Sequence, residues 1–295
     1  MEFLAQVFNG LQLGSIYALV ALGYTMVYGI AKLINFAHGD IIMVGSYTAF
    51  FAIHLWLEPS GLPYWMAIIP TVMVCTLLGM IIERFAYRPL RNSPKIANLI
   101  TAIGVSLLLE HLFVKLFTAN ARPIPPILPS GSLKIGSLSI MYTTIITLLI
   151  TIILTTLLQL FIKKTKRGKS MLAVSEDYGA STLVGISVDH TLSMTFAIGS
   201  ALAGVASILY IASYPQIQPF MGSMLGIKVF TAAVLGGIGS IPGAVFGGLI
   251  LGMIEAITRA YISSKMADAI VFGVLILVLL VKPSGIFGEE ETEKV

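Results

Sequence analysis

The chain has 295 residues, of which 57% are hydrophobic and only 11% are charged, and its formal net charge is +4. Soluble domains carry roughly 25% charged residues, so this composition excludes a single soluble core and predicts a polytopic helical membrane protein. The positive charge is concentrated in two short loops, where it indicates membrane orientation rather than a nucleic-acid partner.

Long apolar runs divide the chain into candidate membrane spans, because a bilayer core of about 30 Å needs about 20 helical residues per crossing. The first run has no positively charged leader and is too long for a signal-peptide core, so we expect a retained helix. The expected spans are 6–30, 39–57, 63–83, 96–118, 140–162, 190–212, 224–258 and 266–281. They predict an all-α transmembrane bundle of about 8–9 membrane segments that forms one domain over residues 1–295.

The apolar run 224–258 is too long for one crossing, since at 1.5 Å per residue it would reach about 50 Å. Its middle reads LGGIGSIPGAVFGG (235–248), and Gly236, Gly237, Gly239 and Pro242 would interrupt a helix there. We therefore predict two shorter helices around a broken or re-entrant segment near 236–242. Such breaks at membrane depth persist where they are buried in protein or line a cavity.

Lysine and arginine placement predicts the orientation of the chain. Four basic residues lie in the loop 84–95 and five in 163–169, so both segments should be cytoplasmic; they are Arg84, Arg88, Arg91, Lys95, Lys163, Lys164, Lys166, Arg167 and Lys169. Counting spans from these loops puts the N-terminus and the Pro-rich loop 119–139 outside. The C-terminal end, with Glu289–Glu291, is then cytoplasmic if 224–258 crosses twice.

Residues 163–190 form the one long polar run of the chain. A structured cytoplasmic segment of this size in an otherwise apolar chain favours a transport subunit that is driven by a separate motor. Arg167-Gly168-Lys169-Ser170 resembles the end of a phosphate-binding loop, but the required earlier glycine and the preceding strand are missing. We therefore expect no nucleotide site in this chain.

Polar residues within membrane segments are costly and mark either function or pairing inside the bundle. They are Asn9, Gln12, Asn35, His38, Asp40, Glu83, Glu110, His111, Glu255 and Arg259. Glu83 and Arg259 are near span ends, where water can reach them. Asp40 suits the first turn of a helix, where an acid complements the dipole, and His38 is either a proton carrier or a structural group.

No histidine, cysteine or carboxylate set has the spacing of a metal site, and no nucleophile lies beside a base. We therefore predict no catalytic residue, no metal and no cofactor on this chain. Cys75, the single cysteine, lies in an apolar run, and we expect an inert buried thiol.

Small residues recur every fourth position near the end of the chain. Gly239, Gly243 and Gly247 form one stripe, and Ala244, Gly248 and Gly252 form a second. This spacing predicts close packing of helices within the bundle or against a second subunit. An alternative is that Pro242 begins a half-helix whose N-terminus attracts a carboxylate.

Four blocks resemble, in order, the permease subunit of branched-chain amino acid ABC importers. They are NGLQLGSIYALVALGYTMVYGIAKLINFAHGD (9–40), ITAIGVSLLLE (100–110), SEDYGASTLVGI (175–186) and VLGGIGSIPGAVFGGLILG (234–252). The resemblance covers nearly the whole chain. The length also matches the shorter of the two permease subunits that these importers use.

The resemblance implies a transport subunit, not an enzyme, in the bilayer of a bacterial or archaeal cell membrane. An external substrate-binding protein would deliver cargo, and this chain with a second permease, identical or different, would form the path. Two cytoplasmic ATPase subunits would use ATP and Mg to drive alternating access.

The resemblance also places the functional residues. It implies a coupling loop at about 163–190, with contacts at Glu176, Asp177, Ala180 and Gly185, although Thr182 stands where related importers have a glycine. The implied substrate path contains Gln12, Asn35, His38, Asp40, Thr101, Gly104, Gly237 and Gly239.

Two alternatives remain at the level of sequence. A permease of the same family could carry urea or short amides, because a path of small residues with few charges does not select the cargo. A self-contained secondary transporter or channel would also suit the broken segment, with Glu110 or Glu255 essential. A membrane-embedded enzyme is not expected, because the chain has no catalytic constellation.

Overall fold

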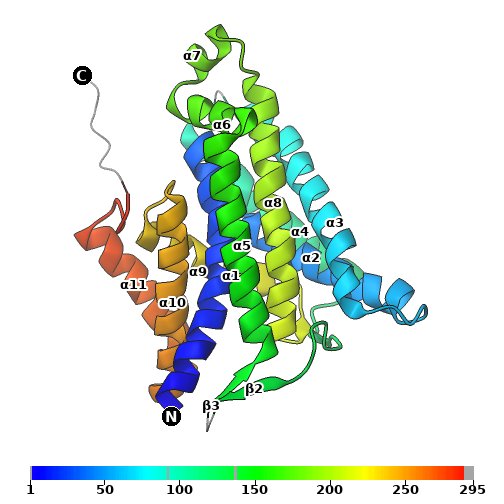
Figure 1. The fold of residues 1–295 in the computed structure, drawn as a ribbon. Helices are drawn as coiled ribbons and strands as arrows, with labels where there is room; N and C mark the ends of the chain where they lie inside the picture. Colours follow the sequence, from blue (N-terminus) through cyan, green and yellow to red (C-terminus); the bar gives the residue numbers. More distant parts are fainter. Residues whose placement is uncertain (1, 92, 136–137, 289–295) are drawn as a thin grey trace.

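The computed structural model describes residues 2–91, 93–135 and 138–288, which form one bundle of helices (Figure 1). The helices are α1 (Glu2–Ala31), α2 (His38–Ala52), α3 (Ile68–Ile82), α4 (Lys95–Phe117), α5 (Tyr142–Lys164), α6 (Lys166–Glu176), α7 (Tyr178–Leu183), α8 (Val188–Ser213), α9 (Met221–Gly236), α10 (Ile241–Tyr261) and α11 (Ala267–Val281). Short π and 3₁₀ turns extend α2 (Ile53–Leu57) and flank α3 (Tyr64–Ala67, Glu83–Tyr87 and Arg88–Leu90).

Within the described residues, seven helical spans are long and apolar enough to cross a membrane, and α9 and α11 are shorter apolar helices. This confirms the predicted all-α bundle. The described residues contain two small antiparallel strand pairs. β1 (Arg122–Pro123) pairs with β4 (Gln216–Ile217), and β2 (Ser132–Ile135) pairs with β3 (Leu138–Met141).

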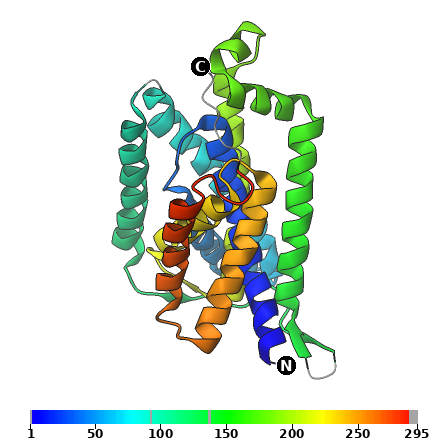
Figure 2. The same ribbon diagram turned by 90° about the vertical axis from the view of Figure 1, so that its left-hand side faces the viewer.

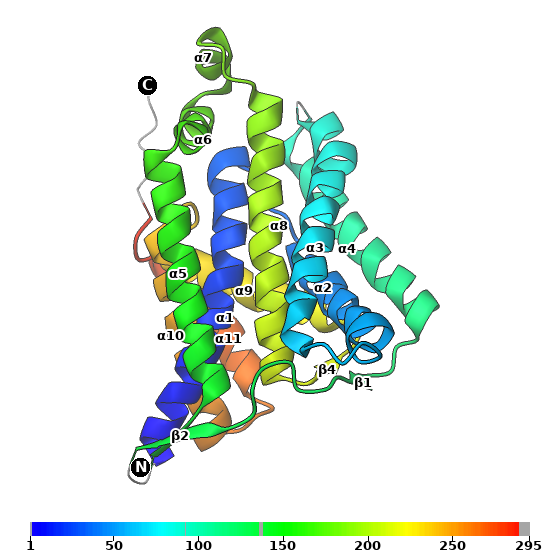
Figure 3. The same ribbon diagram turned by 45° about the vertical axis from the view of Figure 1, so that its right-hand side comes forward.

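Helix α1 is the centre of the bundle, and α10, α8, α5 and α9 pack around it (Figures 2 and 3). Its most apolar window is 89% buried, whereas the corresponding windows of α4 and α5 are only 11% and 22% buried. Leucines and isoleucines dominate the exposed faces of α4 and α5. Such faces suit contact with lipid tails or with another membrane subunit.

The predicted break in the region 224–258 is confirmed. Helix α9 ends at Gly236 and α10 begins at Ile241, and the turn between them needs glycine because Gly237 and Gly239 have φ angles of 104° and 98°. The backbone N–H groups of Ile286 and Phe287 donate to the carbonyls of Leu235 and Gly236, both at 3.0 Å. The segment that follows α11 therefore covers the turn and supplies hydrogen-bond donors to the last two carbonyl groups of α9.

Two details of this region differ from the prediction. Gly239 lies in the turn and not on α10, because Ser240 is the N-cap and accepts a hydrogen bond from the Gly243 N–H at 3.2 Å. The predicted glycine stripe on the helix therefore starts at Gly243. Pro242 follows Ile241 and occupies the second helical position instead of the first.

The two ends of the bundle differ in character. The start of α1 and the β2–β3 hairpin lie at one end, and α6 and α7 lie at the other (Figures 1 and 3). The Arg88–Leu90 turn contacts the α8 end near α7 through Asp189. The two basic loops thus share one end, opposite the start of α1, as the lysine and arginine pattern predicts. Glu289–Glu291 lie outside the described residues.

Helix α2 begins inside the bundle. Lys32 has a φ of 54°, and the chain beyond it turns back along α1. A β-carbon built on Gly23 would lie 2.8 Å from Nε2 of His38, so the first residue of α2 lies beside the middle of α1. This geometry buries the polar junction residues Asn35, His38 and Asp40.

Candidate functional site

The polar run 163–190 forms two short helices with defined caps. Thr165 caps α6 by accepting a hydrogen bond from the Gly168 N–H at 2.9 Å, and Asp177 caps α7 by accepting one from the Ala180 N–H at 2.8 Å. Gly185 has a φ of 83° in the turn that leads into α8. Asp177, Ala180 and Gly185 thus shape this segment, while Glu176 is exposed on its surface.

The end of α7 carries an exposed apolar pair. Leu183 is 89% exposed and the adjacent Val184 is 75% exposed. Helix α7 lies at the outermost part of its end of the bundle (Figure 1). Met171 and Val174 of α6, in contrast, are fully buried and anchor the segment to the core. An exposed apolar tip on a firmly packed base is suited to insert into a partner's pocket.

Helix α7 is also bonded to α1. The Tyr178 hydroxyl donates to the backbone carbonyls of Ile30 and Ala31, at 3.3 and 3.0 Å. Burial raises the pKa of Tyr178 above its ordinary value, so the phenol remains a neutral donor at physiological pH.

An ion-pair cluster joins the α3–α4 connection to the start of α8. Arg88 and Arg91 both pair with Asp189, and Arg91 Nη2 lies 3.2 Å from Glu83 Oε1. The Ser193 hydroxyl donates to the other oxygen of Glu83 at 2.6 Å. Glu83 is only 2% exposed, so the expectation of water contact at this position is wrong, and paired burial replaces it.

A second charge network lies inside the bundle between α9, α10 and α11. Lys228 Nζ lies 2.8 Å from Glu255 Oε1 and 2.6 Å from Asp268 Oδ1. Glu255, which has no exposed surface, also pairs with Arg259 and accepts a hydrogen bond from the Tyr17 hydroxyl at 2.6 Å. Glu255 and Arg259 are among the polar residues predicted to lie in membrane segments, whereas Lys228 is not among them. The sequence does contain a signal for Lys228, because it is a single lysine within an apolar run and such a residue needs a partner inside the bundle.

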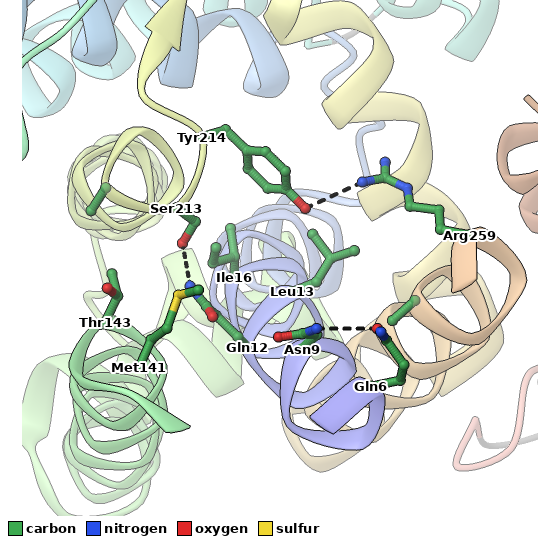
Figure 4. Close-up of a pocket in the computed structure, with 12 residues that line it drawn as sticks. Gln6, Asn9, Gln12, Leu13, Ile16, Met141, Thr143, Ser213, Tyr214 and Arg259 are labelled. Carbon is green, nitrogen blue, oxygen red and sulfur yellow. Dashed lines mark hydrogen bonds between the residues drawn. The ribbon is translucent and has the colours of Figure 1, made fainter. Parts of the chain in front are cut away.

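The Arg259 pocket, a cavity of about 290 Å³, opens at the end of the bundle that holds the start of α1 (Figure 4). Its polar lining is Gln6, Asn9, Gln12, Thr143, Ser213, Tyr214 and Arg259, and its apolar lining is Leu13, Ile16, Met141, Ala212 and Ala256. The Gln12 amide donates to Ser213 at 2.7 Å, and Arg259 Nη1 donates to the Tyr214 hydroxyl at 3.3 Å.

The predicted path residues lie in four separate places within the described chain. Gln12 lines the Arg259 pocket, and Asn35, His38 and Asp40 are buried at the α1–α2 junction. Thr101 and Gly104 lie on α4, where a β-carbon at Gly104 would meet nothing within 4 Å. Gly237 and Gly239 form the turn near the late part of α1, toward the other end of the bundle. Their shared role in a path stays a prediction.

The junction does bring several polar groups together. Asp40 has no exposed surface, and neither of its carboxylate oxygens has a hydrogen-bond partner among the described residues. Gly222 of α9 lies against it, and Ser106 and Glu110 of α4 lie nearby. Glu110 in turn accepts a hydrogen bond from the Ser223 hydroxyl. The first turns of α2 and α9 thus meet around an unpaired buried acid.

The small residues of α10 face two neighbouring helices. Gly243 and Gly247 lie against the backbone of α9, whereas Gly248 and Gly252 lie against α1. A β-carbon on Gly14 of α1 would lie 2.7 Å from the Leu249 Cα. Helix backbones approach this closely where one partner at the contact is glycine.

Within the described residues, no group of three or more His, Cys, Asp and Glu side chains could hold a metal ion. Cys75 is fully buried, as the sequence predicts, and its thiol contacts the Ile41 carbonyl at 3.5 Å.

Comparison with known proteins gives full-length similarity to one family. Residues 6–280 match the family described as the permease component of branched-chain amino acid transport systems. The chain is 44% identical to the high-affinity branched-chain amino acid transport system permease protein LivH of Salmonella typhimurium, covering 100% of this chain and 98% of that relative. It is also 44% identical to the permease protein BraD of Pseudomonas aeruginosa, with the same coverage of both chains.

Proposed function

Since the chain belongs to the family of branched-chain amino acid transport permease components, we propose that it forms half of the translocation path of an ATP-driven importer. It is a multi-pass membrane subunit whose cargo is a branched-chain or other hydrophobic amino acid. A second permease subunit completes the path. A pair of cytoplasmic ATPases supplies the energy, and an external binding protein supplies the cargo.

The observation that carries the assignment of an ATPase partner is the α6–α7 segment. It lies at the end of the bundle that holds both basic loops, and this concentration of positive charge supports assigning that end to the cytoplasm. Its apolar tip, Leu183–Val184, stands above a base that is bonded to α1 through Tyr178. We assign the tip to the ATPase contact. The start of α1 and the β2–β3 hairpin then face outward.

The test is a double variant, Leu183→Glu with Val184→Glu, in cells that take up labelled leucine through this importer. Truncating a central apolar contact costs about 2 kcal/mol or more, and two charges at the tip should exceed that loss. We expect ATPase subunits to be lost from the purified complex and uptake to fall at least tenfold. Leu62→Glu, at an exposed apolar position (44%) in the loop that follows α2, is the control and should behave as wild type.

Retention of the ATPase subunits by the double variant, with normal uptake, would refute the assignment. A second arm separates the importer from a secondary transporter. Collapse of ion gradients while ATP is maintained should leave uptake intact in an ATP-driven system. Competition of labelled leucine by excess urea would indicate the short-amide alternative.

A further inference from the structure

The Arg259 pocket joins a cation to an apolar wall. Among the described residues that line it, Arg259 alone carries a charge, and its side chain is 36% exposed. Met141, which is 60% exposed, supplies apolar surface among the polar groups, and Leu13 and Ile16 line the pocket with little exposed surface of their own (Figure 4). Small-molecule sites combine apolar surface with polar groups that fix the orientation of the ligand, and the lining of this pocket contains both.

The guanidinium retains donors for a ligand. Arginine has five N–H donors, and the structure assigns one Nη1 bond to Tyr214 and one Nη2 bond to Glu255. Glu255 is shared, because Lys228 binds the same carboxylate oxygen and Tyr17 binds the other. Arg259 therefore has no carboxylate of its own, and its exposed edge is directed to a cavity without any acid.

We infer that the Arg259 pocket is a binding site for the carboxylate group of a small zwitterion. The carboxylate pairs with Arg259 beside the Tyr214 hydroxyl, and an aliphatic side chain packs on Met141 and Ala212, the apolar lining residues that have accessible surface. The amide oxygens of Asn9 and Gln6 are neutral acceptors on the same rim. The identification of this ligand as the transported cargo rests on the proposed function. Because the pocket lies at the end proposed to face outward, cargo would bind there early in the transport cycle.

The pocket also discriminates between cargo classes. A neutral amide such as urea offers the arginine a carbonyl oxygen without a negative charge, and it has no aliphatic group to cover the apolar surface. An aliphatic amino acid uses both features, since a charge-assisted bond to arginine is about twice as strong as a neutral one. The cavity of about 290 Å³ is at the lower end of the range for drug-sized ligands, about 300–1,000 Å³, which suits a smaller molecule.

The experiment uses thiol labelling at the rim of the pocket. Asn9 is exposed and hydrogen-bonded only to the neighbouring Gln6, so Asn9→Cys should fold normally. The native Cys75 is fully buried and should give little background. Membranes that contain the whole importer are treated with an anionic methanethiosulfonate, with and without leucine. Leucinol, which lacks the carboxylate, is the matched ligand control, and Asn120→Cys in the exposed loop after α4 is the matched site control.

We expect leucine to slow labelling of Asn9→Cys at least fivefold, leucinol to have no effect, and Asn120→Cys to be unprotected. In uptake assays, Asn9→Asp should lower leucine transport at least tenfold by placing a negative charge beside the site, whereas Asn120→Asp should transport normally. Equal protection by leucinol would overturn the carboxylate assignment, and absence of protection by leucine would overturn the site.

These outcomes are separable from the proposed function. Leucine transport without protection at Asn9→Cys would reject the pocket and retain the importer. Protection without ATP-driven transport would retain the pocket and reject the importer.

Discussion

At the scale of single residues, Glu255 and Asp40 are two fully buried acids with opposite surroundings. Glu255 accepts from Tyr17 and pairs with Lys228 and Arg259, so its charge is compensated on three sides. Asp40 has no hydrogen-bond partner among the described residues. Burial of an acid is costly unless it is paired, so the two positions should respond differently to neutralisation.

We predict that Glu255→Gln destabilises the protein and that Asp40→Asn does not. Loss of one partner of a buried ion pair costs about 3–5 kcal/mol, and the lower end applies because Asp268 still pairs with Lys228. Thermal unfolding of the purified protein in detergent measures the difference. A Glu255→Gln midpoint equal to that of Asp40→Asn would show that the network contributes no stability.

Sequence patterns predicted which residue types were unusual, but not their partners. Glu255 was recognised as a costly acid, and its cation Lys228 is 27 positions away on another helix. Only the break at 236–242 folds α9 against α10 and brings the two together. Similarly, Arg88 and Arg91 were interpreted only as orientation signals. Their pairing with Asp189 could not be predicted, because it depends on how α3 and α8 pack.

At the scale of elements, the contact between α1 and α10 is made backbone to backbone. Gly10 and Gly14 of α1 face Gly252 and its neighbours on α10, and no other helix pair in the described structure is more extensive. Small residues at every fourth position allow this approach. The stripe was readable in the sequence on α10, whereas its partner surface on α1 was not, because the choice of neighbour is a tertiary property.

We predict that Gly14→Ala destabilises the bundle while Gly273→Ala is tolerated. A β-carbon at Gly14 would lie 2.7 Å from Leu249 Cα and 2.9 Å from its carbonyl oxygen, which are backbone atoms that cannot rotate away. A β-carbon at Gly273 of α11 would meet nothing within 4 Å. Overpacking costs about 1–3 kcal/mol. Thermal midpoints of the two variants decide the matter, and equal values would mean that α1 and α10 can separate freely.

The polar run 163–190 was predicted as one segment, but it is divided into two helices. Its charge and position were evident from the sequence, yet its division into α6 and α7 depends on two caps, Thr165 and Asp177. Both are favourable N-cap residues, so this signal was present. Asp177 was instead assigned to partner contact by resemblance. Its cap bond gives it a structural role that the ATPase assignment does not require.

Across the whole molecule, the start of α1, which lines the Arg259 pocket, and helix α7 lie at opposite ends of the bundle (Figure 3). Helix α1 lines the pocket near its start and accepts the Tyr178 hydrogen bonds near its end. The predicted path residues remain dispersed within this chain. A path formed between two permeases depends on the exposed faces of helices such as α4, whose partner cannot be read from one sequence.

We predict that the loop after α4 is outside the cell and that α6 is inside. An impermeant thiol reagent applied to intact cells should label Asn120→Cys and should leave Ser175→Cys unlabelled until the membrane is permeabilised. Cys75 is fully buried and should remain silent in both conditions. The reverse pattern would invert the proposed orientation and would place the α7 tip away from any cytoplasmic ATPase.

The cover over the α9–α10 turn has a consequence for biogenesis. The carbonyls of Leu235 and Gly236 obtain their donors from Ile286 and Phe287, which are synthesised about fifty residues later. Until those residues leave the ribosome, the turn holds polar backbone that lipid cannot satisfy. The nascent chain therefore needs hydrogen-bond donors for these carbonyls from water, the insertion machinery or a chaperone. The turn acquires its own donors only when the C-terminal segment has been made and packs against it.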